Sequence, residues 1–435
     1  MKRSFFVIAL LSVLLGKAHA QSPAELDNLV QASFQNFPKL KEAERLIQSG
    51  EMRVDIAKTA LLPFVNGNLS YTYLTPVAQA ALPTPDGPKT LQFIPHNNYN
   101  FNVSAGYALY DFGKTDLSIR QARENVLTQR HSLELTKQNL AYQVAQLYYS
   151  IGFLQKSIQV QDDVIATSAK LIEQIAVRYQ NGDALEFDIV TQKVRFETAK
   201  TRKIDFENQI EKQRIMLAYL TGIPREDLTI AEFSTPETTT MPAPVGSLMT
   251  QAEGQNKELL LAQDRIRSAE TEIAIAQKAH LPTLLLNASA GVKNGYVPDI
   301  SILRPNTAAG IAVTIPLYAG KRYDLQRKAA EISRQASDYN LEAVSANLRK
   351  DMESVLADRR SNEARLQSLQ AQLTQADRAL AIAENRLANG TITAVELESA
   401  QTGIEEARLG QVNLQYQIFM NGLELQRLAG VEFWK

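Results

Sequence analysis

Cysteine is absent from this chain of 435 residues, and histidine occurs only four times. Without cysteine the chain can form neither disulfides nor thiolate metal sites, and so few histidines leave little for other metal chemistry. The formal net charge is −1, so the chain lacks a basic field that would recruit nucleic acid. Because 45% of the residues are hydrophobic, the chain can bury a large core. The composition predicts a folded protein with no cofactor, no metal site and no nucleic-acid partner.

Long hydrophobic runs are also missing. The longest apolar run, residues 5–15, follows Lys2 and Arg3 and precedes Ala-His-Ala at residues 18–20, which is the three-part pattern of a secretory signal peptide. A spanning helix needs about 20 apolar residues, so this run is too short to be a transmembrane anchor. We therefore predict a signal peptide at residues 1–20 and an exported chain. Any insertion into a membrane would have to use β-strands, because no later segment is apolar enough for a spanning helix.

Matching motifs recur at constant spacings, which indicates a tandem duplication. Ala-Leu-Leu-Pro at residues 60–63 recurs as Ala-His-Leu-Pro at residues 279–282, and Leu-Thr-Gly-Ile at residues 220–223 recurs as Leu-Ala-Gly-Val at residues 428–431. The sequence therefore predicts four parts. They are the signal peptide (1–20), a first structural repeat (21–225), an inter-repeat linker (226–246) and a second structural repeat (247–435).

Each half contains two segments in which apolar residues alternate with small polar ones. We expect strands at about 64–74 and 99–111 in the first half, and at about 283–293 and 308–318 in the second. Such strands of about ten residues are typical of a transmembrane β-barrel, although the edge of a soluble β-sandwich has the same alternation. Between the first two strands, a stretch with five prolines predicts a long irregular loop.

Two long segments have no proline and almost no glycine. They run from Gly113 to Asn181-Gly182 and from Gly320 to Asn389-Gly390. A helix of this length measures roughly 100 Å, at 1.5 Å per residue. Apolar residues step through both segments by three and four, which predicts coiled coils that turn back at each Asn-Gly because a sharp turn needs a residue tolerant of positive φ. Shorter helical segments, at about 23–60 and 247–279, precede the strands and end at Leu-Pro.

The order of these elements resembles the TolC-type outer membrane efflux factor family. The junctions Leu-Tyr-Asp-Phe-Gly-Lys (109–114) and Pro-Leu-Tyr-Ala-Gly-Lys (316–321), the hairpin tips at 178–182 and 386–390, and the duplicated plan carry this resemblance. It implies a mainly α fold with a membrane β-barrel, formed by a homotrimer in which each subunit gives four strands to a twelve-stranded barrel and long antiparallel coiled-coil hairpins to an α-helical tunnel. Three copies are also the first number that leaves a lumen, since an eight-stranded barrel is filled by side chains. The expected helix-strand junction residues are Pro63, Pro282, Pro316, Gly113 and Gly320.

The resemblance implies a channel and not an enzyme. The expected role is the exit duct of a tripartite efflux or type I secretion system in the cell outer membrane, with the helical tunnel in the periplasm. The implied partners are two further copies of the chain, a periplasmic adaptor (membrane fusion) protein, an inner-membrane transporter and outer-membrane lipid. Two alternatives stay open: a periplasmic coiled-coil scaffold, which leaves the strands unexplained, and a passive outer-membrane porin, which leaves the long helices unexplained.

The resemblance also implies two functional sites. The tips Asn181, Gly182, Asn389 and Gly390 would dock the adaptor. In relatives, acidic residues six and nine positions after the second tip glycine line the periplasmic entrance, and here these positions hold Glu396 and Ser399. We therefore expect Glu396 and Ser399 to line the periplasmic gate, where three copies of Glu396 would make a ring that favours cations. Ser399 carries no charge and so departs from the family pattern, although the adjacent residue, Glu398, is acidic.

Overall fold

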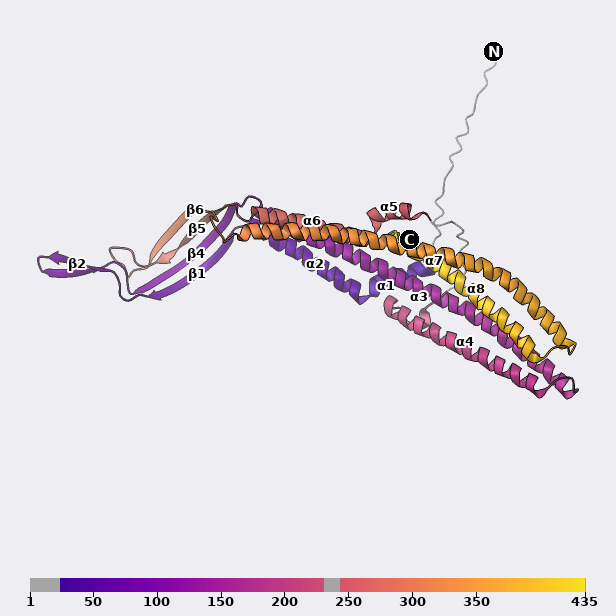
Figure 1. Ribbon diagram of the computed structural model, residues 1–435. Coiled ribbons are helices and arrows are strands. Elements are labelled where there is room, and N and C mark those ends of the chain that lie inside the picture. The colour runs from indigo at the N-terminus through magenta and orange to yellow at the C-terminus, as the bar shows by residue number, and fades with distance from the viewer. Residues whose placement is uncertain (1–23, 231–242, 435) are drawn as a thin grey trace, which may run out of the picture. The chain divides into compact units, whose positions relative to one another are not determined.

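A computed structural model of the chain describes residues 24–230 and 243–434 (Figure 1). The predicted signal peptide at residues 1–20 lies outside the described residues. The chain divides into two compact units, each built from both halves of the sequence. The first consists of Met1–Lys41, Glu134–Lys257 and Ala346–Lys435, and the second of Glu42–Leu133 and Glu258–Ser345. We call the first the hairpin unit and the second the sheet unit.

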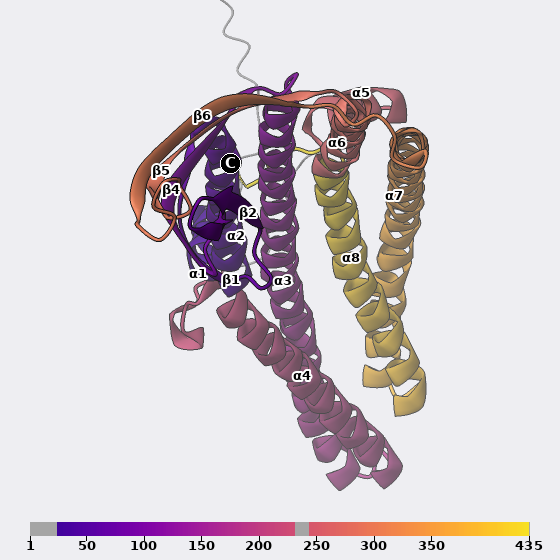
Figure 2. The same cartoon turned by 90° about the vertical axis from the view of Figure 1, so that its left-hand side faces the viewer.

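The sheet unit contains an antiparallel sheet of four strands in the order β1-β4-β5-β6. The strands are β1 (Phe64–Tyr73), β4 (Asn97–Tyr110), β5 (Thr283–Lys293) and β6 (Arg304–Thr314). The two central strands come from different halves of the chain, so the pairing of β4 with β5 joins the halves, and β1 and β6 remain as open edges. Figure 2 shows that this sheet is curved. β6 ends at Thr314, earlier than expected, because Pro316 has no N–H group to continue the ladder.

The proline-rich stretch between β1 and β4 is not the irregular loop that the sequence predicted. It forms a two-stranded hairpin of β2 (Gln79–Thr84) and β3 (Gly87–Gln92). Two prolines face each other in this ribbon, Pro83 opposite Pro88, where a two-stranded pair can tolerate a missing donor. The turn residues are Pro85 and Asp86, and they are followed by Gly87, which has a φ of +105° and pairs with Thr84. Pro-Asp-Gly is a common turn sequence, so one of the prolines was itself part of a turn signal.

The two predicted long helices are present and have equal length. α3 (Lys114–Gln180) and α7 (Arg322–Ala388) contain 67 residues each. In the hairpin unit each one is followed by a returning helix, α4 (Glu186–Thr221) after α3 and α8 (Ala394–Leu428) after α7, and each pair lies side by side (Figure 1 and Figure 2). The predicted apolar stripe is buried in part, with Ile175 2% exposed. None of the helices in the described parts of the chain is long and apolar enough to cross a membrane.

The shorter helical segments before the strands are each broken once. The first consists of α1 (Ala24–Asn36) and α2 (Pro38–Lys58), because Pro38 starts a new helix at a position where its missing N–H has no consequence. The second consists of α5 (Val245–Gln255) and α6 (Lys257–Lys278), with the extended residue Asn256 between them. The Asn256 side chain donates a hydrogen bond of 2.9 Å to the carbonyl of Leu428, which ties this break to the end of α8. Two short 3₁₀ turns, at Thr59–Leu61 and Arg225–Asp227, complete the secondary structure of the described residues.

Candidate functional site

The two hairpin tips have the same backbone geometry. Gly182 and Gly390 have φ values of +84° and +70°, in the left-handed region that favours glycine. In the first tip the N–H of Asp183 donates to the carbonyl of Arg178, and in the second the N–H of Thr391 donates to that of Arg386, with distances of 2.8 and 2.9 Å. This pairing across a left-handed residue is the Schellman motif, which satisfies helix-end carbonyls while the chain reverses. Asn181 and Asn389 occupy the positions immediately before these glycines, at the exposed end of each hairpin.

An arginine and an apolar cluster connect the two tips within one subunit. The guanidinium of Arg178 donates to the carbonyl of Leu387 at the end of α7, and also to the carbonyl of Asp183 in its own turn. Residues from both hairpins form a buried apolar cluster around these contacts: Ile175, Ala383, Leu387, Ala394 and Leu397. The tips therefore form one packed structure, and moving one hairpin would require repacking of the other.

Glu396 caps the start of α8. Its carboxylate accepts a hydrogen bond of 3.0 Å from the N–H of Thr393, while the Thr393 hydroxyl accepts one from the N–H of Glu396, which is a capping box. In the first hairpin Asp188 has the same place and faces the other hairpin, since its carboxylate accepts from the N–H groups of Leu185 and Ala394. Glu396 and Ser399 are both exposed in the single subunit. The carboxylate of Glu396 is thus fixed by its own helix end and still open to solvent.

Further along the hairpins, a buried carboxylate of α8 binds groups from two other helices, α3 and α4. Glu405 of α8 is 4% exposed and pairs with Arg195 of α4, which is 8% exposed, at 3.0 Å. Its carboxylate also accepts from Arg202, which is 45% exposed, and from the amide of Gln161 of α3. Burial lowers the pKa of Arg195, although the neighbouring Glu405 favours its charged form. A buried pair of this kind contributes little net stability but is costly to break, so it fixes the register between α4 and α8.

The junctions between strand and helix use left-handed residues. Phe112 and Gly113 follow β4 with φ values of 58° and 78°, and Gly320 and Lys321 precede α7 with 60° and 64°. Asp111 caps α3 by accepting from the N–H groups of Gly113 and Thr115 at 2.9 and 2.7 Å. Burial raises the pKa of Asp111, but the hydrogen bonds from Thr115, Gly113 and Lys114 outweigh it, so the pKa lies below its ordinary value.

The prolines expected at the junctions all lie just outside the strands. Pro63 immediately precedes β1, Pro282 immediately precedes β5, and Pro316 follows β6. Near Pro282 the side chain of Lys114 donates to the carbonyl of Leu281 at 2.6 Å, which ties the first junction of α3 to the start of β5. Because proline has no N–H group to donate, the hydrogen-bond ladders end at these three prolines, close to the helices.

The four-stranded sheet has one apolar and one polar face. Leu69, opposite Phe101 in the register, belongs to the apolar face and is 79% exposed. Asn68, opposite Asn102, belongs to the polar face, where its amide donates to the side chains of Asn102 and Ser104. A sheet whose apolar face is uncovered needs a non-aqueous environment or a partner to cover it.

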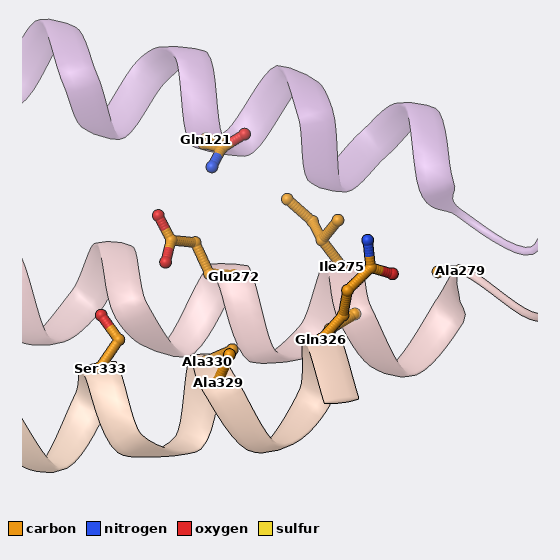
Figure 3. A pocket seen from close by; sticks show the side chains of 9 residues that line it. Gln121, Glu272, Ile275, Ala279, Gln326, Ala329, Ala330 and Ser333 are labelled. Atoms are coloured by element: carbon orange, nitrogen blue, oxygen red, sulfur yellow. The ribbon is translucent and has the colours of Figure 1, made fainter. Parts of the chain in front are cut away.

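An open groove of about 570 Å³ lies between α3, α6 and α7 in the sheet unit (Figure 3). It is lined mainly by small and apolar side chains, together with Gln121 of α3 and Glu272 of α6, which point into the space between the helices. Glu272 is its only titratable group, so the groove has no pair of groups for acid-base catalysis. Within the described residues, no cluster of three histidine or carboxylate side chains could hold a metal ion.

Comparison with known proteins identifies the family. The family described as "Outer membrane efflux protein" matches residues 29–223 and 248–431, which together make up most of the chain. The chain belongs to the outer membrane efflux protein family. It is accordingly a transport protein of the outer membrane and not an enzyme. This agrees with the resemblance to TolC-type proteins noted in the sequence.

Relatives and solved structures of this family extend over nearly the whole chain. The chain is 22% identical to the outer membrane protein TolC of Escherichia coli (strain K12), over 97% of its own length and 86% of the relative. Among solved structures, the outer membrane protein VceC from Vibrio cholerae aligns with a TM-score of 0.76 at 20% identity, over 94% of this chain and 97% of that one. A structure of CusC aligns with a TM-score of 0.78 at 17% identity, over 94% and 92%. The efflux protein fold of long helices and a small antiparallel sheet is therefore shared.

Sequence reasoning missed two features of these sites. The capping role of Glu396 was readable, because Thr393-x-x-Glu396 is a capping-box pattern at the start of a helix. The Glu405 network was not, since Arg195 and Glu405 are 210 residues apart and meet only through helix packing.

Proposed function

We propose that this protein is the outer-membrane exit duct of a tripartite efflux or type I secretion system and that it assembles as a homotrimer. The observation that carries the proposal is a four-stranded sheet with two open edges and an exposed apolar face. Open edges leave backbone groups that lipid cannot hydrogen-bond, so a sheet in a membrane must close. Three copies would supply twelve strands and enclose a lumen. The polar face would line this lumen, and the apolar face would contact outer-membrane lipid.

The surface of α7 in the sheet unit supports self-association. Leu325, Ile332 and Tyr339 follow one another at intervals of seven residues and are 61%, 65% and 72% exposed. A heptad stripe of this kind is typical of a helix that packs against another helix, and none of the three is covered within the single subunit. We propose that the neighbouring copy covers it.

Native mass spectrometry of the detergent-solubilised protein tests the assembly. We expect a trimer, and Ile332→Glu should increase the fraction of monomer because it places a charge in the proposed interface. Ser333→Glu is the matched control and should leave the trimer intact, because Ser333 is exposed, lies about 100° around the helix from Ile332 and lines the groove within the same subunit. A wild-type protein whose stable folded form is a monomer would overturn the proposal.

The hairpin tips are proposed to dock a periplasmic adaptor, which connects the duct to an inner-membrane transporter. Asn181, Gly182, Asn389 and Gly390 lie in two matching turns that end the hairpins, and these rigid, exposed turns would present a repeated surface to the adaptor. Site-specific crosslinking from a photoreactive group at Asn389 should capture the adaptor in intact cells. Capture from the β2–β3 turn of the sheet unit instead would contradict this assignment.

Glu396 is proposed to form the periplasmic gate, with Ser399 beside it on the next turn. The exposed carboxylate at the start of α8 supports this role, since three copies around an axis would make an acidic ring. Glu396→Gln tests it cleanly, because glutamine can still accept the capping hydrogen bond from Thr393. In planar bilayers, this variant should have a weaker cation preference and less block by multivalent cations. Glu353→Gln, which neutralises an exposed carboxylate of α7, serves as the control. A Glu396→Gln channel that keeps the wild-type cation preference and cation block would refute the gate.

The tandem duplication also stays a proposal, with repeats at residues 21–225 and 247–435 and a linker at 226–246. The match of the family in two segments, residues 29–223 and 248–431, supports it. So do the paired junctions and tips, which have left-handed residues at corresponding places in both halves.

A further inference from the structure

The four-stranded sheet is nearly free of charge. Its strands contain no aspartate or glutamate, and their only basic residues are Lys293 at the end of β5 and Arg304 at the start of β6. The register places these two residues directly opposite each other. Like charges in directly opposite positions destabilise a strand pair. The placement of the only two charges is therefore unfavourable for the sheet alone.

The pair lies on the polar face. Ser70, Asn100, Lys293 and Arg304 form one row across the four strands, because each is the register partner of the next and partners in an antiparallel sheet share a face. The rows nearer the helices contain only uncharged side chains on this face, such as Asn68 and Asn102. The row with Lys293 and Arg304 lies at the end of β5 and β6 farthest from the helices.

Neither cation is neutralised nearby. Both side chains are partly exposed, and neither forms a salt bridge with a residue that the structure describes. Lys293 lies over the ring of Tyr296, with its Nζ 5.1 Å from the centroid, which holds the ammonium without cancelling its charge. The one carboxylate of the connecting loop, Asp299, accepts a hydrogen bond from the N–H of Ser301. The pair therefore keeps a net charge of two on an otherwise neutral face.

We propose that Lys293 and Arg304 form an anion-binding collar at the outer mouth of the lumen. This inference rests on the proposed trimeric duct, in which three copies of the pair would bring six positive charges around one opening. A ring of one sign concentrates counter-ions, and an arginine guanidinium beside a lysine ammonium suits phosphate and carboxylate groups. The ligand class is a soluble multivalent anion, since the polar face is turned away from lipid. The collar would attract anionic solutes to the exit, while the acidic ring proposed at Glu396 acts on cations in the hairpin unit.

Binding of inorganic tripolyphosphate tests the collar without requiring channel activity. Isothermal titration calorimetry on the full-length protein in neutral detergent compares the wild type with the double variant Lys293→Gln/Arg304→Gln. We expect binding to the wild type that weakens with salt, and an affinity at least about tenfold lower for the double variant. Lys89→Gln removes an exposed lysine of β3, outside the four-stranded sheet, and should bind as the wild type does. Equal affinity of the wild type and the double variant, or no binding to the wild type, would overturn the collar.

A lipid phosphate offers the same chemistry, so vesicles of phosphatidylglycerol form a second arm. Vesicle capture that depends on Lys293 and Arg304, without tripolyphosphate binding, would place the pair against lipid and overturn the lumen assignment. Planar-bilayer recordings then separate the collar from the duct: tripolyphosphate should block the wild-type channel from the outer side, and the double variant should need about tenfold more. A wild type that forms no channel but binds tripolyphosphate through the pair would refute the duct and leave the collar supported.

Discussion

Replacing Glu405 by leucine should loosen the hairpins locally. The substitution removes the acceptor shared by Arg195, Arg202 and Gln161, and it leaves the guanidinium of Arg195, which is only 8% exposed, without its carboxylate. Breaking a buried ion pair by removing one partner costs about 3–5 kcal/mol, because the remaining charge is desolvated and uncompensated. The loss should appear as easier opening of α4 against α8.

Hydrogen exchange of the backbone amides measures this opening. At about 1.4 kcal/mol per tenfold, the expected loss corresponds to exchange that is roughly 100-fold to several-thousand-fold faster for α4 and α8 around these residues. Arg202→Leu is the matched control. It removes a partner of the same carboxylate that is 45% exposed, so the expected loss is only about 0–1 kcal/mol.

A double variant distinguishes a broken pair from general damage to the core. Arg195→Leu combined with Glu405→Leu replaces the ion pair by two apolar side chains, and such replacements are often neutral or stabilising. Exchange in this variant should return to within about tenfold of the wild type, a change of about 1.4 kcal/mol. The reasoning is wrong if Glu405→Leu alone changes exchange by less than tenfold, or if the double variant is no better than the single one.

Three further changes test the tips, a junction and the outer hairpin. Gly182→Ala and Gly390→Ala should each destabilise a tip by about 1–2 kcal/mol, because alanine is strained in a left-handed backbone conformation. Hydrogen exchange of the amides in that turn should become faster. Gly390→Ala should have the larger effect, because its Cβ would lie 3.3 Å from the Arg178 guanidinium. Asp111→Asn should remove a pH-dependent contribution to the free energy of unfolding. Because the folded state lowers the pKa of Asp111, this contribution is fully present above the unfolded pKa of 3.8 and is lost as the pH falls through the lower, folded pKa. The stabilities of the wild type and the variant, measured by unfolding at several pH values, should therefore converge in acid. A cysteine replacing Pro85 in the β2–β3 turn should react with an impermeant thiol reagent on intact cells, and labelling only after outer-membrane rupture would contradict the proposed topology.

Local patterns in the sequence determined the elements and their order. Absence of proline and a three-four apolar spacing predicted α3 and α7, and Asn-Gly predicted the turns at Gly182 and Gly390, since both signals depend only on neighbouring residues. Alternation predicted all four strands of the main sheet. It located the ends less well, because Pro316 and the register with β5 decide where the ladder of β6 stops.

Tertiary structure decided which distant residues meet. Arg195 and Glu405 are 210 residues apart in the sequence, so their pairing depends on the register of α4 against α8 and not on any local pattern. Lys293 and Arg304 are close in sequence, but only the strand register places them opposite each other and on the polar face. A shift of one residue would move either side chain to the other face, because successive side chains of a strand point to opposite sides. The sequence thus set the elements, and packing and register set the charges that they bring together.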